Sequence, residues 1–160
     1  MAVRFRSRGD VVWRVQLFVF VVVSLLTAVP ASGQLRVVNY NTLFGGPANA
    51  TEEALVSTIF DGIATQSRNG IAKRPDIIAL QEQSFQAGTT STQRVADTLN
   101  TLYGVTTYQA TNPTGGSGVF RLGYVYDSST VGLVNTTNVP VGIRNGVRAE
   151  WAPVGYTNAN

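Results

Sequence analysis

The stretch "RPDIIALQEQS", residues 74–84, places the amide of Gln81 and the carboxylate of Glu82 directly after an apolar run. Pro75 favours a turn, and the apolar residues that follow it predict a buried strand from Asp76 to Gln81. This strand leads straight into the carboxylate of Glu82. A carboxylate at the end of a buried strand is costly unless water or a partner group solvates it. The position of Glu82 therefore has to be explained.

A second apolar segment, "LRVVNYNT" at residues 35–42, precedes this strand in the chain. Its β-branched and aromatic residues predict a strand from Leu35 to Asn41, and Gly45-Gly46-Pro47 predicts a turn after it. A helix is predicted next, capped by Asn49 or Thr51 and favoured by acidic residues in its first turn. Its predicted apolar face consists of residues spaced three and four apart: Leu55, Val56, Ile59, Phe60 and Ile63.

The two strands are expected to be parallel neighbours, because a crossover through one helix is right-handed. Asn41 ends the first strand and Glu82 the second, so a carboxamide and a carboxylate are expected at one edge of the sheet, where α/β folds bind ligands. Oxygen atoms of these types suit Mg²⁺ or Mn²⁺. The alternative is that Glu82 is simply solvated at the start of a loop and that Asn41 is a turn residue.

Further elements follow along the chain. The sequence predicts a loop over Thr65 to Lys73, and then a helix from Thr92 to Tyr103 that stops at Gly104. A third strand is predicted from Val105 to Thr111. The segment from Asn112 to Gly118 has the composition of a flexible loop.

From Phe120 to Tyr126, large apolar or aromatic residues occupy every second position, which is typical of a half-buried antiparallel strand. One face of this strand, expected to pack in the core, is formed by Phe120, Leu122, Tyr124 and Tyr126. A tight turn at Asp127 predicts a hairpin with a return strand from Val131 to Val134, and Arg148 to Val154 predicts one more strand. This order of elements predicts an α/β or α+β layered domain with a mixed sheet.

The N-terminus has the three parts of a secretory signal peptide. Four arginines precede an apolar run of 15 residues, from Val15 to Val29, which leads to the small residues Ala31 and Gly33. A membrane anchor is the alternative, but such a run is shorter than the roughly 20 residues that span a bilayer. We therefore expect a signal peptide over residues 1–33 and a secreted or periplasmic domain over residues 34–160.

The composition excludes several kinds of site. Cleavage of the leader would remove four of the 12 basic residues and one of the nine acidic ones, leaving eight of each. The remaining chain is neutral, so its charge gives no reason to expect a nucleic-acid partner. The 160 residues contain neither cysteine nor histidine, which excludes disulfides, thiolate zinc sites and an imidazole base.

The pair of motifs "LRVVNYNT" and "RPDIIALQE" resembles the opening of the endonuclease/exonuclease/phosphatase superfamily of metal-dependent phosphoesterases, whose members resemble DNases, sphingomyelinases and inositol-phosphate phosphatases. The resemblance implies that Asn41 helps to arrange the site and that Glu82 binds Mg²⁺ or Mn²⁺, with Asn41 as a further candidate ligand. "GVFRLGYVYDSSTVGLV" resembles the family's next hairpin. "RNGVRAEW" resembles a strand that brings an arginine to the substrate phosphate, which makes Arg148, or less favourably Arg144, a candidate.

The resemblance covers about residues 35–155, the first half of a four-layer α/β/β/α sandwich. The family's later Asp-x-Asn and Asp-His motifs have no counterpart in these 160 residues. We therefore expect a partial sandwich from a truncated chain, a fragment or a decayed homologue, with little or no turnover alone. Half a sandwich exposes apolar surface, so residues 34–160 are expected to be poorly soluble or to self-associate.

The expected function is hydrolysis of a phosphoester in nucleic acid, a phospholipid head group or a sugar phosphate, by metal-assisted in-line attack of water. The alternative is a non-catalytic secreted interaction or surface module that uses the same strands as a scaffold. Divalent metal binding that depends on Glu82 distinguishes the enzyme from the module.

Overall fold

A four-stranded sheet in the order β1-β4-β8-β7 lies at the centre of the fold. The computed structural model describes residues 34–86, 88–112, 121–140 and 146–155. The strands of the sheet are β1 (Val37–Gly45), β4 (Ile77–Gln83), β8 (Arg121–Asp127) and β7 (Tyr108–Ala110). β1 and β4 are parallel, whereas β8 is antiparallel to both β4 and β7. The predicted fold class, with a mixed sheet and a parallel opening pair, is confirmed.

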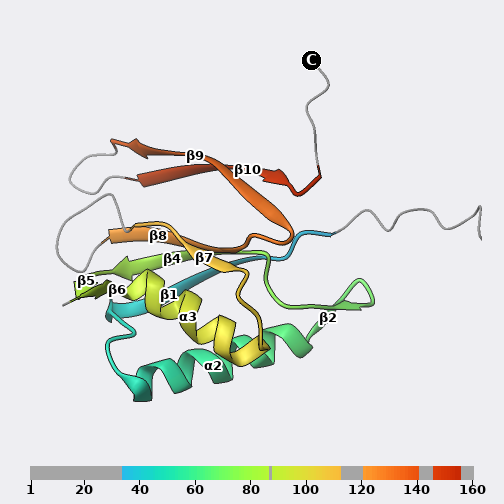
Figure 1. The fold of residues 1–160 in the computed structure, drawn as a ribbon, viewed down its shortest axis with the longest axis horizontal. Coiled ribbons are helices and arrows are strands. Elements are labelled where there is room, and N and C mark those ends of the chain that lie inside the picture. The colour runs from blue at the N-terminus through green and yellow to red at the C-terminus, as the bar shows by residue number, and fades with distance from the viewer. Residues whose placement is uncertain (1–33, 87, 113–120, 141–145, 156–160) are drawn as a thin grey trace, which may run out of the picture. The chain divides into compact units, whose positions relative to one another are not determined.

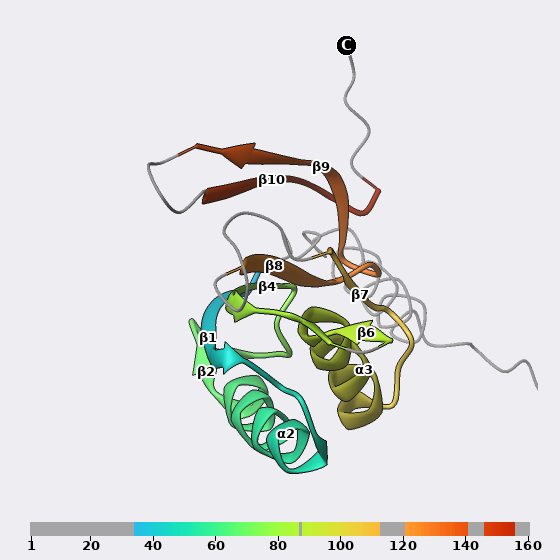
Figure 2. The same cartoon turned by 90° about the vertical axis from the view of Figure 1, so that its left-hand side faces the viewer.

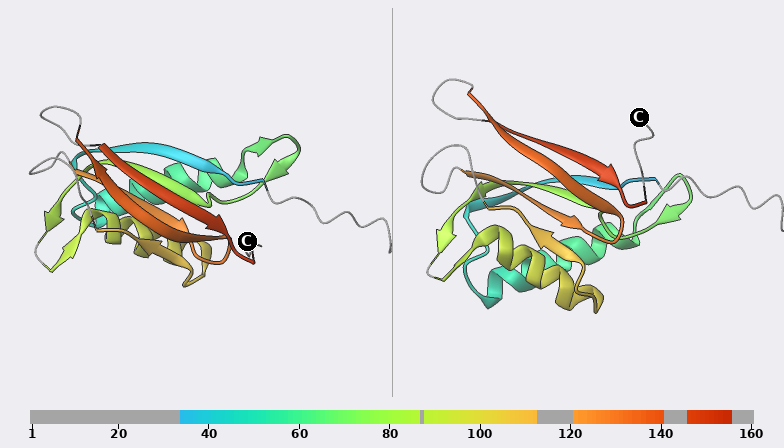
Figure 3. Two further views of the ribbon diagram at one scale, coloured as in Figure 1. Left: turned by 90° about the horizontal axis from the view of Figure 1, so that it is seen from above. Right: turned by 45° about the horizontal axis from the view of Figure 1, so that its top comes forward.

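Two helices cover one face of this sheet, and a β-hairpin lies over the other face (Figures 1 and 2). The helices are α2 (Ala50–Thr65) and α3 (Ser91–Tyr103), and the hairpin consists of β9 (Val131–Val139) and β10 (Gly146–Pro153). Seen from above, the hairpin crosses the sheet and β1 remains visible beside it (Figure 3). The described residues therefore form α/β/β layers, in the order expected for the predicted partial sandwich.

Helix α2 begins where its sequence predicts but buries a narrower face. The side chain of Asn49 accepts hydrogen bonds from the backbone N–H groups of Thr51 and Glu52, so Asn49 is the N-cap. Val56 and Phe60 are buried against the sheet. The predicted face was too wide, because Leu55 is 60% exposed and Ile59 is exposed as well.

The core lies between the helices and the sheet. Helix α3 ends at Gly104, which adopts the left-handed backbone conformation with φ of 63°, as its place after the last apolar residue predicts. Val95 and Leu99 of α3 are fully buried, as predicted. The core cluster consists of Val56, Phe60, Ile78, Leu80, Val95, Ala96, Leu99, Tyr108 and Val125.

The predicted pairing of the return strand with β8 is wrong. A turn does follow Asp127, whose backbone carbonyl accepts a hydrogen bond from the N–H of Thr130 at 3.0 Å. The chain then leaves the sheet, and β9 pairs with β10 in an antiparallel hairpin. Tyr124 and Tyr126 explain why this hairpin stays over β8, because both rings pack against Trp151 of β10. The alternation of β8 is as predicted, but the face expected in the core is wrong: Val125 on the opposite face belongs to the core cluster, whereas Tyr124 and Tyr126 are half-buried under the hairpin.

Two short hairpins lie at the ends of β4. The predicted loop before β4 contains β2 (Ser67–Arg68) paired with β3 (Ile71–Ala72). After β4, β5 (Phe85–Gln86) pairs with β6 (Thr89–Thr90) and leads into α3. The predicted third strand is real but shorter, since only the three residues of β7 pair with β8.

Some predictions fall outside the described residues. These are the leader over residues 1–33, most of the loop from Asn112 to Gly118, and Phe120 at the start of the alternating strand. Within the described ranges, neither helix has the length and apolar character to cross a membrane.

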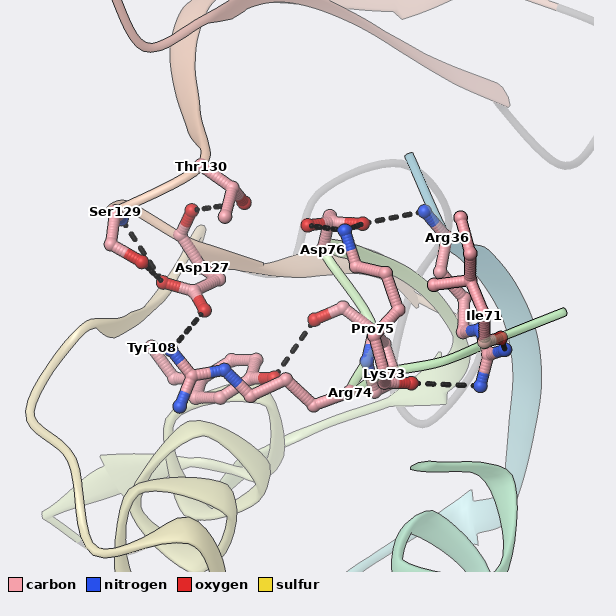
Figure 4. Close-up of polar contacts among 10 residues, drawn as sticks. All are labelled: Arg36, Ile71, Lys73, Arg74, Pro75, Asp76, Tyr108, Asp127, Ser129 and Thr130. Carbon is pink, nitrogen blue, oxygen red and sulfur yellow. Dashed lines mark hydrogen bonds and ion pairs between the residues drawn. The ribbon is translucent and has the colours of Figure 1, made fainter. Parts of the chain in front are cut away.

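Charged side chains join the strands at the edge where β1 and β4 begin (Figure 4). The backbone N–H of Arg36 donates to the carboxylate of Asp76, which also binds Lys73 at 2.8 Å. The guanidinium of Arg36 donates to backbone carbonyls at the end of α2 and in the segment that follows it: Ile63, Gln66, Ile71 and Lys73. One arginine therefore ties the start of β1 to the end of the helix that connects β1 to β4.

The other half of this network lies at the end of β8. Asp127 is 1% exposed and forms an ion pair with Arg74 at 2.8 Å, and it accepts hydrogen bonds from Ser129. The hydroxyl of the buried Tyr108 donates to the carbonyl of Pro75 at 2.8 Å (Figure 4). We call the set of Arg36, Lys73, Arg74, Asp76 and Asp127 the charged edge.

Candidate functional site

The structure brings Asn41 and Glu82 into contact, as the sequence predicts. The side-chain amide of Asn41 donates to the carboxylate of Glu82 at 3.1 Å. The contact lies where β1 and β4 end, because Asn41 is paired with Gln81 in the parallel register. Two residues that are 41 positions apart in the chain therefore meet at the C-terminal edge of the sheet.

A β-bulge in β4 determines which way Glu82 points. On β8, Gly123 pairs with Leu80 and Arg121 pairs with Gln83, so two residues of β4, Gln81 and Glu82, lie opposite one residue of β8. In a regular strand, Glu82 would follow Ile78 and Leu80 onto the helix-covered face. The inserted residue shifts the alternation, so that Gln83 is buried and Glu82 is partly exposed. This bulge is the physical reason why an acidic residue can end a buried strand.

The backbone of Glu82 is strained by the same bulge. Its φ of 57° lies in the left-handed region, which a residue with a Cβ atom rarely adopts. Such conformations persist where the surrounding structure enforces them, and they occur often at functional sites. Leu43, on the facing part of β1, has the same φ of 57°.

Amide groups orient the carboxylate. The backbone N–H of Leu43 donates to Asn41 Oδ1 at 2.8 Å, and this fixes Asn41 Nδ2 as the atom that faces Glu82. Beside this pair, Gln81 donates to Asn39 Oδ1 at 3.0 Å. We call these four residues, Asn39, Asn41, Gln81 and Glu82, the amide rim. Glu82 is the only one of the four whose side chain carries a charge.

This geometry separates the roles of the two predicted metal ligands. A carboxylate with an oriented Oε1 suits a hard divalent cation. Asn41 instead turns a donor group toward Glu82 while its oxygen accepts from Leu43, so its contact supports a positioning role. Among the described residues there is no cluster of three or more acidic, histidine or cysteine side chains. The rim itself contributes one carboxylate, that of Glu82.

Arg148, the one predicted arginine that lies within the described residues, is not part of the amide rim. Arg148 lies on β10, where its guanidinium pairs with Glu150 on the exposed face of the hairpin. Its side chain is 65% exposed. Arg144 lies outside the described residues.

A groove between the helices lies apart from the rim. It has a volume of about 410 Å³ and is lined by Thr89 of β6 and by residues of α2 and α3, including Glu53, Arg94 and Thr98. Arg94 and Glu53 form an ion pair at 2.9 Å within it. No residue of the amide rim lines this groove.

Sequence reasoning missed two residues of this region. Asn39 lies two residues before Asn41, so the alternation of β1 already places both side chains on one face, and this signal could have found it. Gln83 could not have been found, because a regular strand would have placed it on the exposed face. Comparison with known proteins adds no assignment: no protein-family model matches the chain, and no curated protein matches it.

Proposed function

We propose that the amide rim is part of the metal site of an exported phosphoesterase of the endonuclease/exonuclease/phosphatase type. The single observation that supports this most is the bulge that turns Glu82 out of the core and toward Asn41, at the C-terminal ends of two parallel strands. Ligand sites of open α/β sheets lie at this edge. The resemblance of the two strand motifs to that superfamily assigns the same two residues.

The chemistry follows from one charged group and its amide partners. A bound Mg²⁺ or Mn²⁺ would neutralise phosphate charge and polarise the P–O bond. Glu82 holds its negative charge at the rim, and Asn41 fixes the orientation of the carboxylate. The substrate would be a phosphoester in nucleic acid, a phospholipid head group or a sugar phosphate. The leader over residues 1–33 would carry the protein to the periplasm or out of the cell.

Thermal unfolding of the 160-residue chain in Mg²⁺ or Mn²⁺ tests the proposal. Both cations should raise the Tm of the wild type by several degrees at saturation, because a ligand that binds only the folded state stabilises it. Glu82→Gln should abolish the increase. Glu150→Gln is the matched control, since this exposed carboxylate belongs to an ion pair on the hairpin and its loss should leave the increase intact. An equal increase in the Glu82→Gln variant would favour the non-catalytic module.

A further inference from the structure

A buried polar side chain lies directly next to the bulge. Gln83 is completely buried. Its amide nitrogen donates to Thr42 Oγ1 at 2.7 Å and to the carbonyl of Gln81 at 3.0 Å. Its amide oxygen accepts from the hydroxyls of Ser91 at 2.9 Å and Thr92 at 3.1 Å, both at the start of α3. Both donors and both acceptor positions of the amide are therefore satisfied inside the protein.

Thr42 completes the support from the side of β1. The regular pairing of β1 with β4 is interrupted after the pair Asn41–Gln81 and resumes at the pair Gly45–Gln83. Within this gap, Thr42 Oγ1 lies 3.0 Å from the carbonyl of Gln81 and 3.3 Å from that of Glu82. A side-chain hydroxyl thus binds the backbone carbonyls of the bulge where the regular ladder is interrupted.

We infer that Thr42 and Gln83 are positioning residues, which hold the left-handed backbone of Glu82 and thereby direct its carboxylate to the amide rim. Neither side chain touches that carboxylate. Both bind the peptide groups around it, and without them the strand could relax to regular alternation. Regular alternation would turn Glu82 toward the face of Ile78 and Leu80. The functional meaning of this role rests on the function proposed above.

The backbone itself provides a test that needs no metal. The Cα and amide chemical shifts of Glu82, measured by NMR, report its φ. In the 160-residue chain, Thr42→Val should shift them from left-handed toward extended values, whereas Thr42→Ser, which keeps the hydroxyl, should retain the wild-type shifts. Left-handed values in folded Thr42→Val and Gln83→Leu variants would overturn the inference.

Mn²⁺ affinity, measured by electron paramagnetic resonance, provides the second readout. Thr42→Val should weaken binding about 10-fold or more, as loss of an outer-shell partner does, and Thr42→Ser should restore it. Tyr108→Phe is the matched control, because it removes a buried hydrogen bond at the charged edge and should lower the Tm without changing the affinity. Unchanged affinity in a folded Thr42→Val variant also contradicts the inference. A wild type that binds no Mn²⁺ contradicts the proposed function instead, and the NMR experiment still decides the role of Thr42.

Discussion

The two ends of the β1–β4 pair use opposite means to hold their polar groups. At the charged edge, buried carboxylates are paired with basic side chains, as in Asp76 with Lys73 and Asp127 with Arg74. At the amide rim, Glu82 is contacted by the neutral amide of Asn41. The first arrangement pairs carboxylates with cationic side chains, whereas in the second a neutral side-chain amide donates to the carboxylate. The comparison shows how one pair of strands can be stabilised at one edge and present a carboxylate at the other.

The largest effect should come from breaking the charged edge. Asp127→Ala removes the acceptor for Ser129 and the partner of Arg74, and we expect a loss of about 3 kcal/mol in the free energy of unfolding, because an ion pair with one buried member is broken. Urea denaturation measures this loss. Glu150→Ala, which breaks an exposed pair with Arg148, is the control and should change stability by less than about 0.5 kcal/mol. Equal losses in the two variants would remove the distinction between the charged edge and an ordinary surface pair.

The second-largest effect should come from disturbing the hydrogen bond between Thr92 and Gln83 next to the bulge. A Cβ atom at Gly123 would lie 2.8 Å from Thr92 Oγ1 and 3.1 Å from its Cγ2, so Gly123→Ala should displace Thr92 from Gln83. We expect a loss of about 1–3 kcal/mol from overpacking, together with weaker Mn²⁺ binding. The control is Gly62→Ala, since a Cβ there meets nothing within 4 Å and alanine favours the helix. A stable Gly123→Ala variant with normal Mn²⁺ affinity would show that this close approach does not support the rim.

Acid should weaken the charged edge. Burial alone would raise the pKa of Asp127, but hydrogen bonds from Ser129 and the charge of Arg74 outweigh it and hold the pKa below its ordinary value. The ionised group therefore stabilises the fold above the unfolded pKa of about 3.9, and this contribution is lost as the pH falls toward the lower folded value. The free energy of unfolding, measured between pH 6 and pH 2, should fall less steeply in Asp127→Asn. The same slope in both proteins would contradict this assignment.

The smallest effect has the opposite sign and lies at the rim. Glycine adopts positive φ without the penalty that a Cβ atom brings, so Glu82→Gly should leave stability unchanged or raise it by up to about 1 kcal/mol. Glu82→Gln keeps the strained backbone and is the control that should show no such gain. Chemical denaturation of the two variants measures the difference. A clear loss in Glu82→Gly would mean that the side chain of Glu82 stabilises the fold.

Local signals in the sequence were sufficient for the elements that carry the site. Asn49 caps the start of α2 and Gly104 ends α3. Both helix ends are determined by residues that are close in the sequence. The parallel pairing of β1 and β4 follows from one helix between two apolar strands. Taken together, these features are enough to predict that Asn41 and Glu82 lie at one edge of the sheet.

The bulge and the second hairpin could not be predicted in the same way. The run Ile78, Leu80, Glu82 keeps a regular period of two, so nothing local marks the inserted residue. The bulge is held by hydrogen bonds between the Gln83 side chain and residues on other elements, namely Thr42, Ser91 and Thr92. The position of the β9–β10 hairpin over β8 likewise involves contacts between separate elements, those of Tyr124 and Tyr126 with Trp151.

The parallel pairing also sets the order of events during folding. Hydrogen bonds that assemble the rim and its support from β1 and β4 join residues 39 to 42 positions apart: Thr42 with Gln81 and Gln83, Asn41 with Glu82, and Asn39 with Gln81. Closing a loop of that length costs conformational entropy before the contacts that offset this cost have formed. Non-local pairing of this kind slows folding. A peptide that contains either strand alone therefore carries no part of the site's geometry, and on a ribosome this geometry forms only after β4 has emerged.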